Sequence, residues 1–257
     1  EGGSFGTRQA GFGAGYRGES VDLQLGVSDL DTDGANIARS GGEDDGYRNR
    51  SYNLKGGWSA TEELRLSLAA RRSDGRSNFD DIDYATGLPA DAPLWSDFRT
   101  DTARLQADYA SFGGAWQHKL VYALTDSHND NFSAGLSAGR NSAQKDQYRY
   151  ISSVQWAAGT QRVSLLHERE EEDFRQRGEA MPWGDPNQDR ERSADSAGLE
   201  YRGTFADALT LAASARHDDN SEFEDADTWR LEAVYALAAG TRLRAAGGTA
   251  VKNPTFA

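Results

Sequence analysis

The chain of 257 residues contains no cysteine, which rules out a disulfide framework and a thiolate metal site. Basic residues are scarce: 28 Lys and Arg stand against 41 Asp and Glu, giving a net charge of -13. A chain with this balance lacks the clustered cations that binding to a nucleic-acid backbone requires. Mean hydropathy is -0.76, and no stretch approaches the roughly 18–20 apolar residues of a membrane helix.

The chain also lacks an initiator Met and a charged-then-apolar leader at its start. Its end, 251–257 (VKNPTFA), follows a predicted strand and adds no further strand that would close a sheet. We therefore expect a piece of a longer polypeptide, so that any localisation concerns the parent protein.

What the chain does contain is a repeated alternation of apolar and polar residues. Val21, Leu23, Leu25 and Val27 alternate with polar or small residues, and similar runs follow at 64–71, 103–109, 209–215 and 229–237. Successive side chains of a strand point to opposite faces, so each run predicts a strand with one apolar face. Most predicted strands approach or exceed the roughly 9–11 residues of a tilted membrane strand. About twelve are predicted, over 4–17, 20–31, 47–58, 63–74, 98–111, 115–128, 145–157, 161–172, 191–203, 208–217, 226–237 and 241–251.

The connections between these strands alternate in length, as in a meander that crosses a membrane. Short links lie at 18–19, 59–62, 112–114, 158–160, 204–208 and 238–240. Long polar links lie at 31–47, 75–98, 129–145, 172–191 and 218–226. The sequence thus predicts an all-β, antiparallel, up-and-down transmembrane β-barrel.

Aromatic residues near strand ends are typical of the girdles at membrane surfaces, although β propensity also places aromatics in any strand. They are Trp58, Tyr109, Trp116, Tyr148, Tyr150, Trp156, Tyr201, Trp229 and Tyr235. The face opposite the apolar stripe is polar, which fits either a wet or plugged lumen or the solvated face of a soluble sandwich. It carries Arg65, Arg71, Arg104, Asp108, Gln155, Arg202, Arg230, Glu232, Arg242 and Arg244.

Several segments carry a family resemblance. The most specific lie between 215 and 254: 215–223 (ARHDDNSEF), 228–229 (TW), 240–242 (GTR) and 248–254 (GTAVKNP). Segments 1–7 (EGGSFGT), 44–47 (DDGY) and 154–157 (VQWA) fit the same order and spacing. Together they resemble the barrel of TonB-dependent outer-membrane receptors, most of all that of cobalamin (vitamin B12) receptors.

The resemblance implies a 22-stranded barrel closed around an N-terminal plug, which imports cobalamin across the Gram-negative outer membrane by coupling to TonB. Residues 1–257 would be about the first half of that barrel domain, without the plug and the C-terminal strands. Half a barrel has two unpaired edges, which lipid does not tolerate, so we expect the fragment alone neither to insert nor to transport. Two alternatives stay open: a ferric-siderophore receptor, and a passive porin-like or structural barrel of twelve strands.

Candidate ligands for a metal lie in the predicted long links. Asp80, Asp81 and Asp83 follow Asn78-Phe79, and the resemblance implies that such carboxylates hold Ca²⁺, a cation that takes oxygen ligands. A merely solvated acidic loop is the alternative. Further carboxylates follow at Asp91, Asp97 and Asp101, and a second cluster comprises Asp31, Asp33, Glu43, Asp44 and Asp45. Contacts with the transported ligand are expected in the links 31–47, 75–98, 129–145 and 172–191.

Catalysis is not predicted, because nothing resembles a nucleophile elbow and His118, His128, His167 and His217 share no ligand spacing. No redox or nucleotide cofactor is expected. The charge run 168–173 (EREEED) is interpreted as a solvated rim where a strand enters a loop. Such a rim could also bind divalent cations that bridge lipopolysaccharide. The expected partners are therefore cobalamin or a siderophore, TonB through the missing plug, and outer-membrane lipid.

Overall fold

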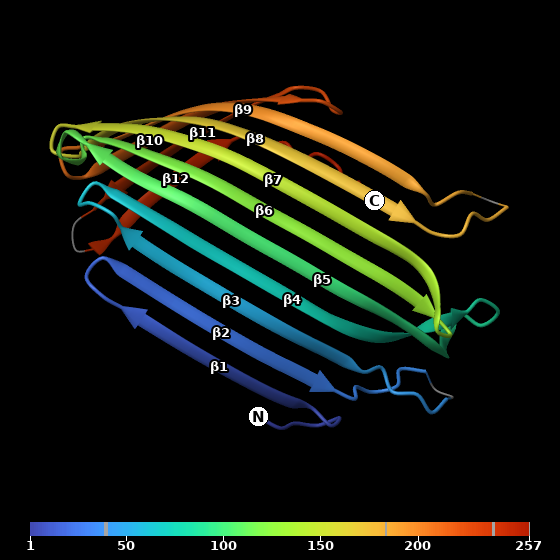
Figure 1. Ribbon diagram of the computed structural model, residues 1–257. Coiled ribbons are helices and arrows are strands. Elements are labelled where there is room, and N and C mark those ends of the chain that lie inside the picture. Colours follow the sequence, from blue (N-terminus) through green and yellow to red (C-terminus); the bar gives the residue numbers. More distant parts are fainter. Residues whose placement is uncertain (39–40, 183, 238–239, 257) are drawn as a thin grey trace.

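The computed structural model describes residues 1–38, 41–182, 184–237 and 240–256. Within them, twelve antiparallel strands form one curved sheet in which each strand pairs with the next along the chain (Figure 1). The strands are β1 Arg8–Arg17, β2 Val21–Thr32, β3 Tyr47–Ser59, β4 Leu64–Asp83, β5 Leu88–Ser111, β6 Trp116–Ser133, β7 Leu136–Trp156, β8 Gln161–Arg177, β9 Gln188–Phe205, β10 Leu209–Asn220, β11 Ala226–Ala236 and β12 Arg242–Gly248. A 3₁₀ turn, η1 (Phe112–Gly114), joins β5 to β6.

The predicted fold class is confirmed: the sheet is an up-and-down antiparallel meander. In the described residues the edge strands β1 and β12 do not pair with each other, so the sheet is open. No helix in the described ranges is long and apolar enough to cross a bilayer.

The two faces of the sheet have opposite character. Register places the apolar stripe on one face, where Leu68 of β4 faces Leu105 of β5 and Leu105 faces Tyr122 of β6. Side chains on this face splay apart, and Leu105 and Leu165 are 51% and 57% exposed. The most buried polar residues, Ser51, Ser153, Glu168 and Ser196, all lie on the opposite face, where curvature brings side chains together. The concave face is therefore the polar one, and the apolar face is the outer one.

The strands are tilted relative to the apolar band, as the register shows. The row of paired residues that begins at Leu64, the first residue of β4, ends at Ala215, six residues beyond the start of β10 at Leu209. The row runs through Leu64, Tyr109, His118, Ser152, Leu165, Leu199 and Ala215. Six rises of about 3.3 Å over six strand spacings of about 4.8 Å give a tilt of about 35°. Transmembrane barrels have tilts of roughly 35–45°.

The aromatic residues predicted to form girdles all lie on the outer face. Trp58, Tyr109, Trp116 and Trp156 stand at the short-turn end of the apolar band, next to the tight connections. Tyr148 and Trp229 lie at its other end. This distribution is that of an outward-facing apolar band with aromatic residues at both margins.

Two of the predicted long links are wrong. Residues 75–98 and 129–145 are mostly strand, and the turns that join the strands there are only 84–87 and 134–135. Their many polar residues suggested loops, but these strands extend beyond the apolar band, where polar residues such as Asp74 and Arg76 share the strands with Phe79, Leu94 and Trp95. Cross-strand ion pairs then stabilise them, such as Arg76 with Asp97 at 2.6 Å.

The remaining connections are shorter than predicted. The link 31–47 narrows to 33–46, and 218–226 narrows to 221–225. Likewise, 172–191 narrows to 178–187 because β8 continues to Arg177. Arg39, Ser40 and Trp183 in two of these links, and Ala238–Ala239 in the predicted short link 238–240, lie outside the described residues.

Candidate functional site: the concave polar wall

Strands β7 and β8 carry complementary charges on the concave face. Lys145, Gln147 and Arg149 alternate along β7, and Glu168, Glu170 and Glu172 alternate along β8. The tight turn at 157–160 sets a register that places Arg149 opposite Glu168, Gln147 opposite Glu170, and Lys145 opposite Glu172. Two period-2 patterns on neighbouring antiparallel strands therefore meet as one polar cluster.

Glu168 is the most deeply placed member of this cluster, with 2% of its surface exposed. Its carboxylate accepts hydrogen bonds from Arg149, from Nη2 of Arg216 at 3.0 Å and from Nε2 of Gln147 at 3.1 Å. Arg216 continues the network to Ser196 and to Asp218 at 2.7 Å. A buried carboxylate is tolerated here because two guanidinium groups compensate its charge.

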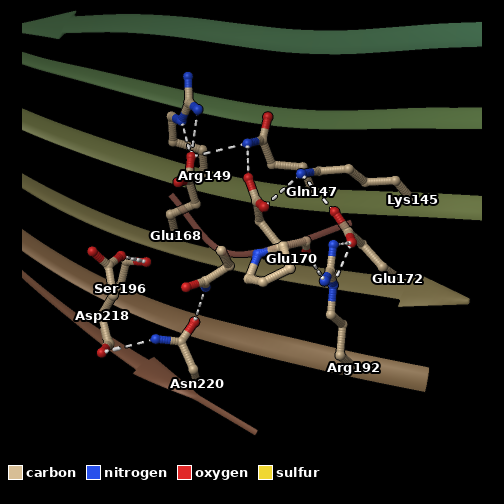
Figure 2. A network of polar contacts seen from close by, with 12 residues as sticks. Lys145, Gln147, Arg149, Glu168, Glu170, Glu172, Arg192, Ser196, Asp218 and Asn220 are labelled. Atoms are coloured by element: carbon tan, nitrogen blue, oxygen red, sulfur yellow. Dashed lines mark hydrogen bonds and ion pairs between the residues drawn. The ribbon is translucent and has the colours of Figure 1, made fainter. Parts of the chain in front are cut away.

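A second branch runs through Glu170 and Glu172 (Figure 2). Nζ of Lys145 lies 2.6 Å from Glu170 and 3.0 Å from Glu172, and Nε of Arg192 lies 2.6 Å from Glu172. Burial by itself would raise the pKa of Glu172, but the hydrogen bonds from Lys145 and Arg192 hold it below its usual value. Gln147 joins the two branches, because its amide also donates to Glu170 at 2.6 Å.

The C-terminal segment 249–256 lies across this wall. Arg192 donates to the Pro254 carbonyl at 2.8 Å and stacks its guanidinium over the Phe256 ring at 4.1 Å. Phe256 also stacks on Phe174 of β8, with ring centroids 5.8 Å apart. The Asn253 amide donates to Asn220 of β10 at 3.1 Å. Arg192 thus connects the charge network to a segment that lines the concave space.

The structure brings only some of the predicted metal ligands together. Asp80 accepts hydrogen bonds from the backbone amides of Ala38 and Ala92, at 3.1 and 3.4 Å, while Asp91 accepts one from Gly42 at 3.2 Å. The pKa of Glu43 is raised, first by burial and then by the charges of Asp91, Asp80 and Asp45. Four carboxylates from three separate segments therefore share one electrostatic environment.

Asp81 and Asp83 lie apart from Asp80 in their contacts. Asp83 caps the turn that follows it, accepting from the Ala85 amide at 2.9 Å and the Thr86 hydroxyl at 2.8 Å. Asp81 accepts from the Ile82 amide. Asp97 and Asp101 form outward ion pairs with Arg76 and Arg72, respectively. Among the described residues no group of three or more acidic or histidine side chains has a geometry that would hold a metal ion, and calcium binding stays a prediction.

The comparison of the sequence with known families is decisive. The profile of the TonB dependent receptor-like β-barrel matches residues 33–257. The chain belongs to this family. The family is one of receptors and transporters, not of enzymes, and the curved sheet with its outward apolar band is its barrel domain.

Solved structures of siderophore receptors and of a copper transporter share this fold. The siderophore receptor PirA from Pseudomonas aeruginosa is 15% identical, with a TM-score of 0.75 over 97% of this chain and 40% of that one. PirA from Acinetobacter baumannii is 15% identical, with a TM-score of 0.77 over 96% of this chain and 41% of that one. The copper transporter OprC is 14% identical, with a TM-score of 0.73 over 99% of this chain and 44% of that one. No curated protein matches the sequence.

The chain thus spans about 40% of the length of the receptor structures that it matches. At these identities the likeness shows the fold alone. It agrees with the register, tilt and face polarity in assigning the concave wall to the lumen of a TonB-dependent receptor barrel.

Sequence reasoning missed most of this lumenal network. The run 168–173, predicted to be a solvated rim, lies inside β8, where Glu168, Glu170 and Glu172 face the lumen and Arg169, Glu171 and Asp173 face outward. Lys145, Gln147, Arg149, Arg192 and Arg216 were not singled out. The available signal was the matching alternation of cations at 145–149 and anions at 168–172, separated by one tight turn.

Proposed function

We propose that the chain forms part of the wall of an outer-membrane importer driven through TonB, and that the transported ligand is a ferric siderophore. The proposal is supported most by a lumenal wall that is polar and rich in guanidinium groups within a TonB-dependent receptor fold. Ferric siderophore complexes present oxygen-rich and often anionic surfaces, for which Arg is a good partner.

A hollow in the lumenal wall supports binding of such a ligand. It measures about 550 Å³ and is lined by residues of β9 to β12, among them Glu200, Arg202, Arg230 and Arg242. Arg230 is paired with Glu232 at 2.9 Å. Arg202 and Arg242 have no ion pair in the described part of the chain, so their donors are available to an anion.

The chain covers only about 40% of each receptor structure that it matches. This coverage supports a second part of the proposal, namely that residues 1–257 are a segment of a longer chain. The rest of that chain would supply the strands that pair with β1 and β12 and the plug that contacts TonB. The importer would reside in the outer membrane of a Gram-negative bacterium.

Cobalamin is the second candidate ligand, and one observation favours it. Glu43, Asp45, Asp80 and Asp91 converge where the segment 33–46 meets the β4–β5 hairpin. We propose that Ca²⁺ binding there, with Asp80 as a ligand and Asp81 and Asp83 as neighbouring carboxylates, would order a surface for cobalamin. Burial first, and then the charges of Asp91, Asp80 and Asp45, raise the pKa of Glu43, and a bound cation would relieve the repulsion among these carboxylates.

Uptake by cells that carry the full-length receptor tests the proposal. We expect labelled ferric siderophore to accumulate, and accumulation to stop when the inner-membrane proton gradient is collapsed. Chelator-sensitive uptake of cyanocobalamin, without siderophore uptake, would assign cobalamin instead. Uptake that persists without the gradient would indicate a passive porin-like barrel and refute the energy-coupled function.

A further inference from the structure

The segment 249–256, here called the strap, leaves the edge of the sheet and crosses the lumenal wall. The backbone amide of Thr249 still donates to the Trp229 carbonyl of β11 at 2.9 Å. Phe256 at the far end stacks on Phe174 of β8, so the C-terminal end lies beside β8, four strands from β12 (Figure 1). Four strand spacings of about 4.8 Å amount to about 19 Å, and seven extended residues reach about 23 Å. The strap is therefore nearly extended and has little slack.

Arg192 of β9 holds the far end of the strap. Its guanidinium donates to the Pro254 carbonyl at 2.8 Å and lies 4.1 Å from the centroid of the Phe256 ring. The same group lies 5.7 Å from the ring of Phe223 in the β10–β11 connection, and Glu172 of the wall binds its Nε at 2.6 Å. The Arg192 side chain is only 19% exposed, which strengthens these contacts relative to those on a solvated surface. One side chain of the wall thus holds two separate segments.

The strap covers a hollow of about 380 Å³ on the lumenal wall, here called the upper hollow. It is lined both by the wall and by the strap, among others by Ser196, Arg216, Thr228, Ala250 and Asn253. One lumenal step from Arg216 along β10, Ser214 lines the hollow of about 550 Å³ that contains Arg202 and Arg242. The two hollows therefore follow each other along the strands. Because the strap reaches Phe174 and Asn220 near the ends of β8 and β10 that lead into long connections, a ligand entering from that side meets the strap first.

We propose that the strap is a gate of the lumenal path, that Arg192 is its clasp, and that an anionic ligand opens it by binding the guanidinium. The Pro254 carbonyl is a neutral acceptor, whereas anionic oxygens make charge-assisted hydrogen bonds that are roughly twice as strong. An anion that binds Nη1 of Arg192 replaces this carbonyl and frees the end of the strap. Glu172 keeps its bond to Nε and so holds Arg192 on the wall during the exchange. Opening by the transported ligand rests on the proposed siderophore import, whereas the closed state of the strap does not.

The distance between two spin labels on the purified full-length receptor tests the clasp. One label replaces Val251, which is 59% exposed on the strap, and the other replaces Glu191, an exposed outward residue of β9. We expect one short distance in the wild type, and we expect Arg192→Gln to raise the ratio of open to closed strap about tenfold. The matched control is Arg190→Gln, which removes the neighbouring lumenal charge of β9. In the described residues Arg190 makes no hydrogen bond, ion pair or ring contact with the strap, so the control should keep the short distance.

A second variant separates the clasp from the stability of the wall. Phe256→Ala removes the stacked ring but leaves Arg192 and its bond to Glu172 in place. The ratio of open to closed strap should therefore rise about threefold without loss of the folded barrel. An unchanged distance in both Arg192→Gln and Phe256→Ala would overturn the proposal.

Inorganic phosphate is the probe for opening by an anion. Excess phosphate should raise the open fraction in the wild type but not further in Arg192→Gln, and chloride at the same ionic strength should leave it unchanged. Equal effects of phosphate and chloride on the wild type would refute the exchange at Arg192. Ferric siderophore uptake by cells with the wild-type receptor tests the proposed function separately, because its absence beside phosphate-dependent opening would refute siderophore import and retain the gate.

Discussion

Replacing Glu168 by Gln removes the charge that holds the lumenal network together. The carboxylate is 2% exposed and is bound by Arg149, Arg216 and Gln147. Gln keeps the size of the side chain and one acceptor oxygen, but it leaves two guanidinium groups without their shared anion. Charge-assisted hydrogen bonds contribute about 1.5–3 kcal/mol each, and breaking a buried ion pair costs about 3–5 kcal/mol.

Solvent exposure of the two arginines makes the loss of stability smaller than these energies for fully buried groups. The side chains of Arg149 and Arg216 are 35% and 36% exposed, so water partly replaces the lost partner. Arg216 also keeps its ion pair with Asp218 at 2.7 Å. We therefore expect Glu168→Gln to lower the free energy of unfolding by about 2–3 kcal/mol.

The assay is the temperature at which the purified full-length receptor loses its folded mobility in detergent gels. The matched control is Glu171→Gln, which removes an outward carboxylate of the same strand that is paired with Arg169. We expect this temperature to fall clearly for Glu168→Gln. For the control we expect little change in it, corresponding to a free-energy difference within about 0.5 kcal/mol. Equal shifts for the two variants would refute the reasoning. So would an absence of coupling between Glu168→Gln and Arg216→Gln in a double-mutant cycle.

Three further predictions concern other parts of the barrel. Leu105→Arg, in the middle of the outward apolar band, should destabilise the membrane-inserted receptor by about 2–4 kcal/mol. Ser67→Arg on the lumenal face is the control and should not destabilise it. Equilibrium folding into lipid vesicles measures both variants. Gly75→Ala should lower the free energy of unfolding by about 1–3 kcal/mol, because a Cβ at this position would lie 2.7 Å from Phe98 and overlap the Arg48 carbonyl. Gly247→Ala is the control, since a Cβ at Gly247 would meet open space. Thermal unfolding measures both variants. The raised pKa of Glu43 means that acidification through it neutralises the carboxylate and stabilises the segment 33–46, so proteolysis there should slow as the pH falls. Glu43→Gln should show the slow rate already at neutral pH, and an unchanged pH dependence in that variant would contradict the assignment.

The sequence predicted much of this architecture from a local property. Alternation in runs such as Val21 to Val27 defines which side chains share a face, because that depends only on strand geometry. The outward aromatics were identified on the same basis. Strand ends were predicted less well, since the β4–β5 and β6–β7 hairpins continue as strands where polar residues suggested loops. Outside the apolar band, composition no longer distinguishes a strand from a loop.

The candidate site was only partly visible in the sequence. The cluster of Asp80, Asp81 and Asp83 is contiguous along the chain, but alternation sends neighbouring side chains to different partners. The structure instead groups Asp80 with Asp91 and Glu43, which are 11 and 37 residues away along the chain. Contacts of this kind depend on how the segment 33–46 folds over the next hairpin, which no local pattern encodes.

By itself, the sequence determined the strand-rich meander, the polarity of its two faces and the placement of aromatics along them. Only the tertiary structure decided the register, the tilt of about 35° and the meeting of Lys145, Arg149 and Arg192 with the glutamates of β8. The physical reason is that a one-residue slip moves every side chain of a strand to the other face. Turn geometry and the packing of all neighbouring strands together select the register, and with it the lumenal network.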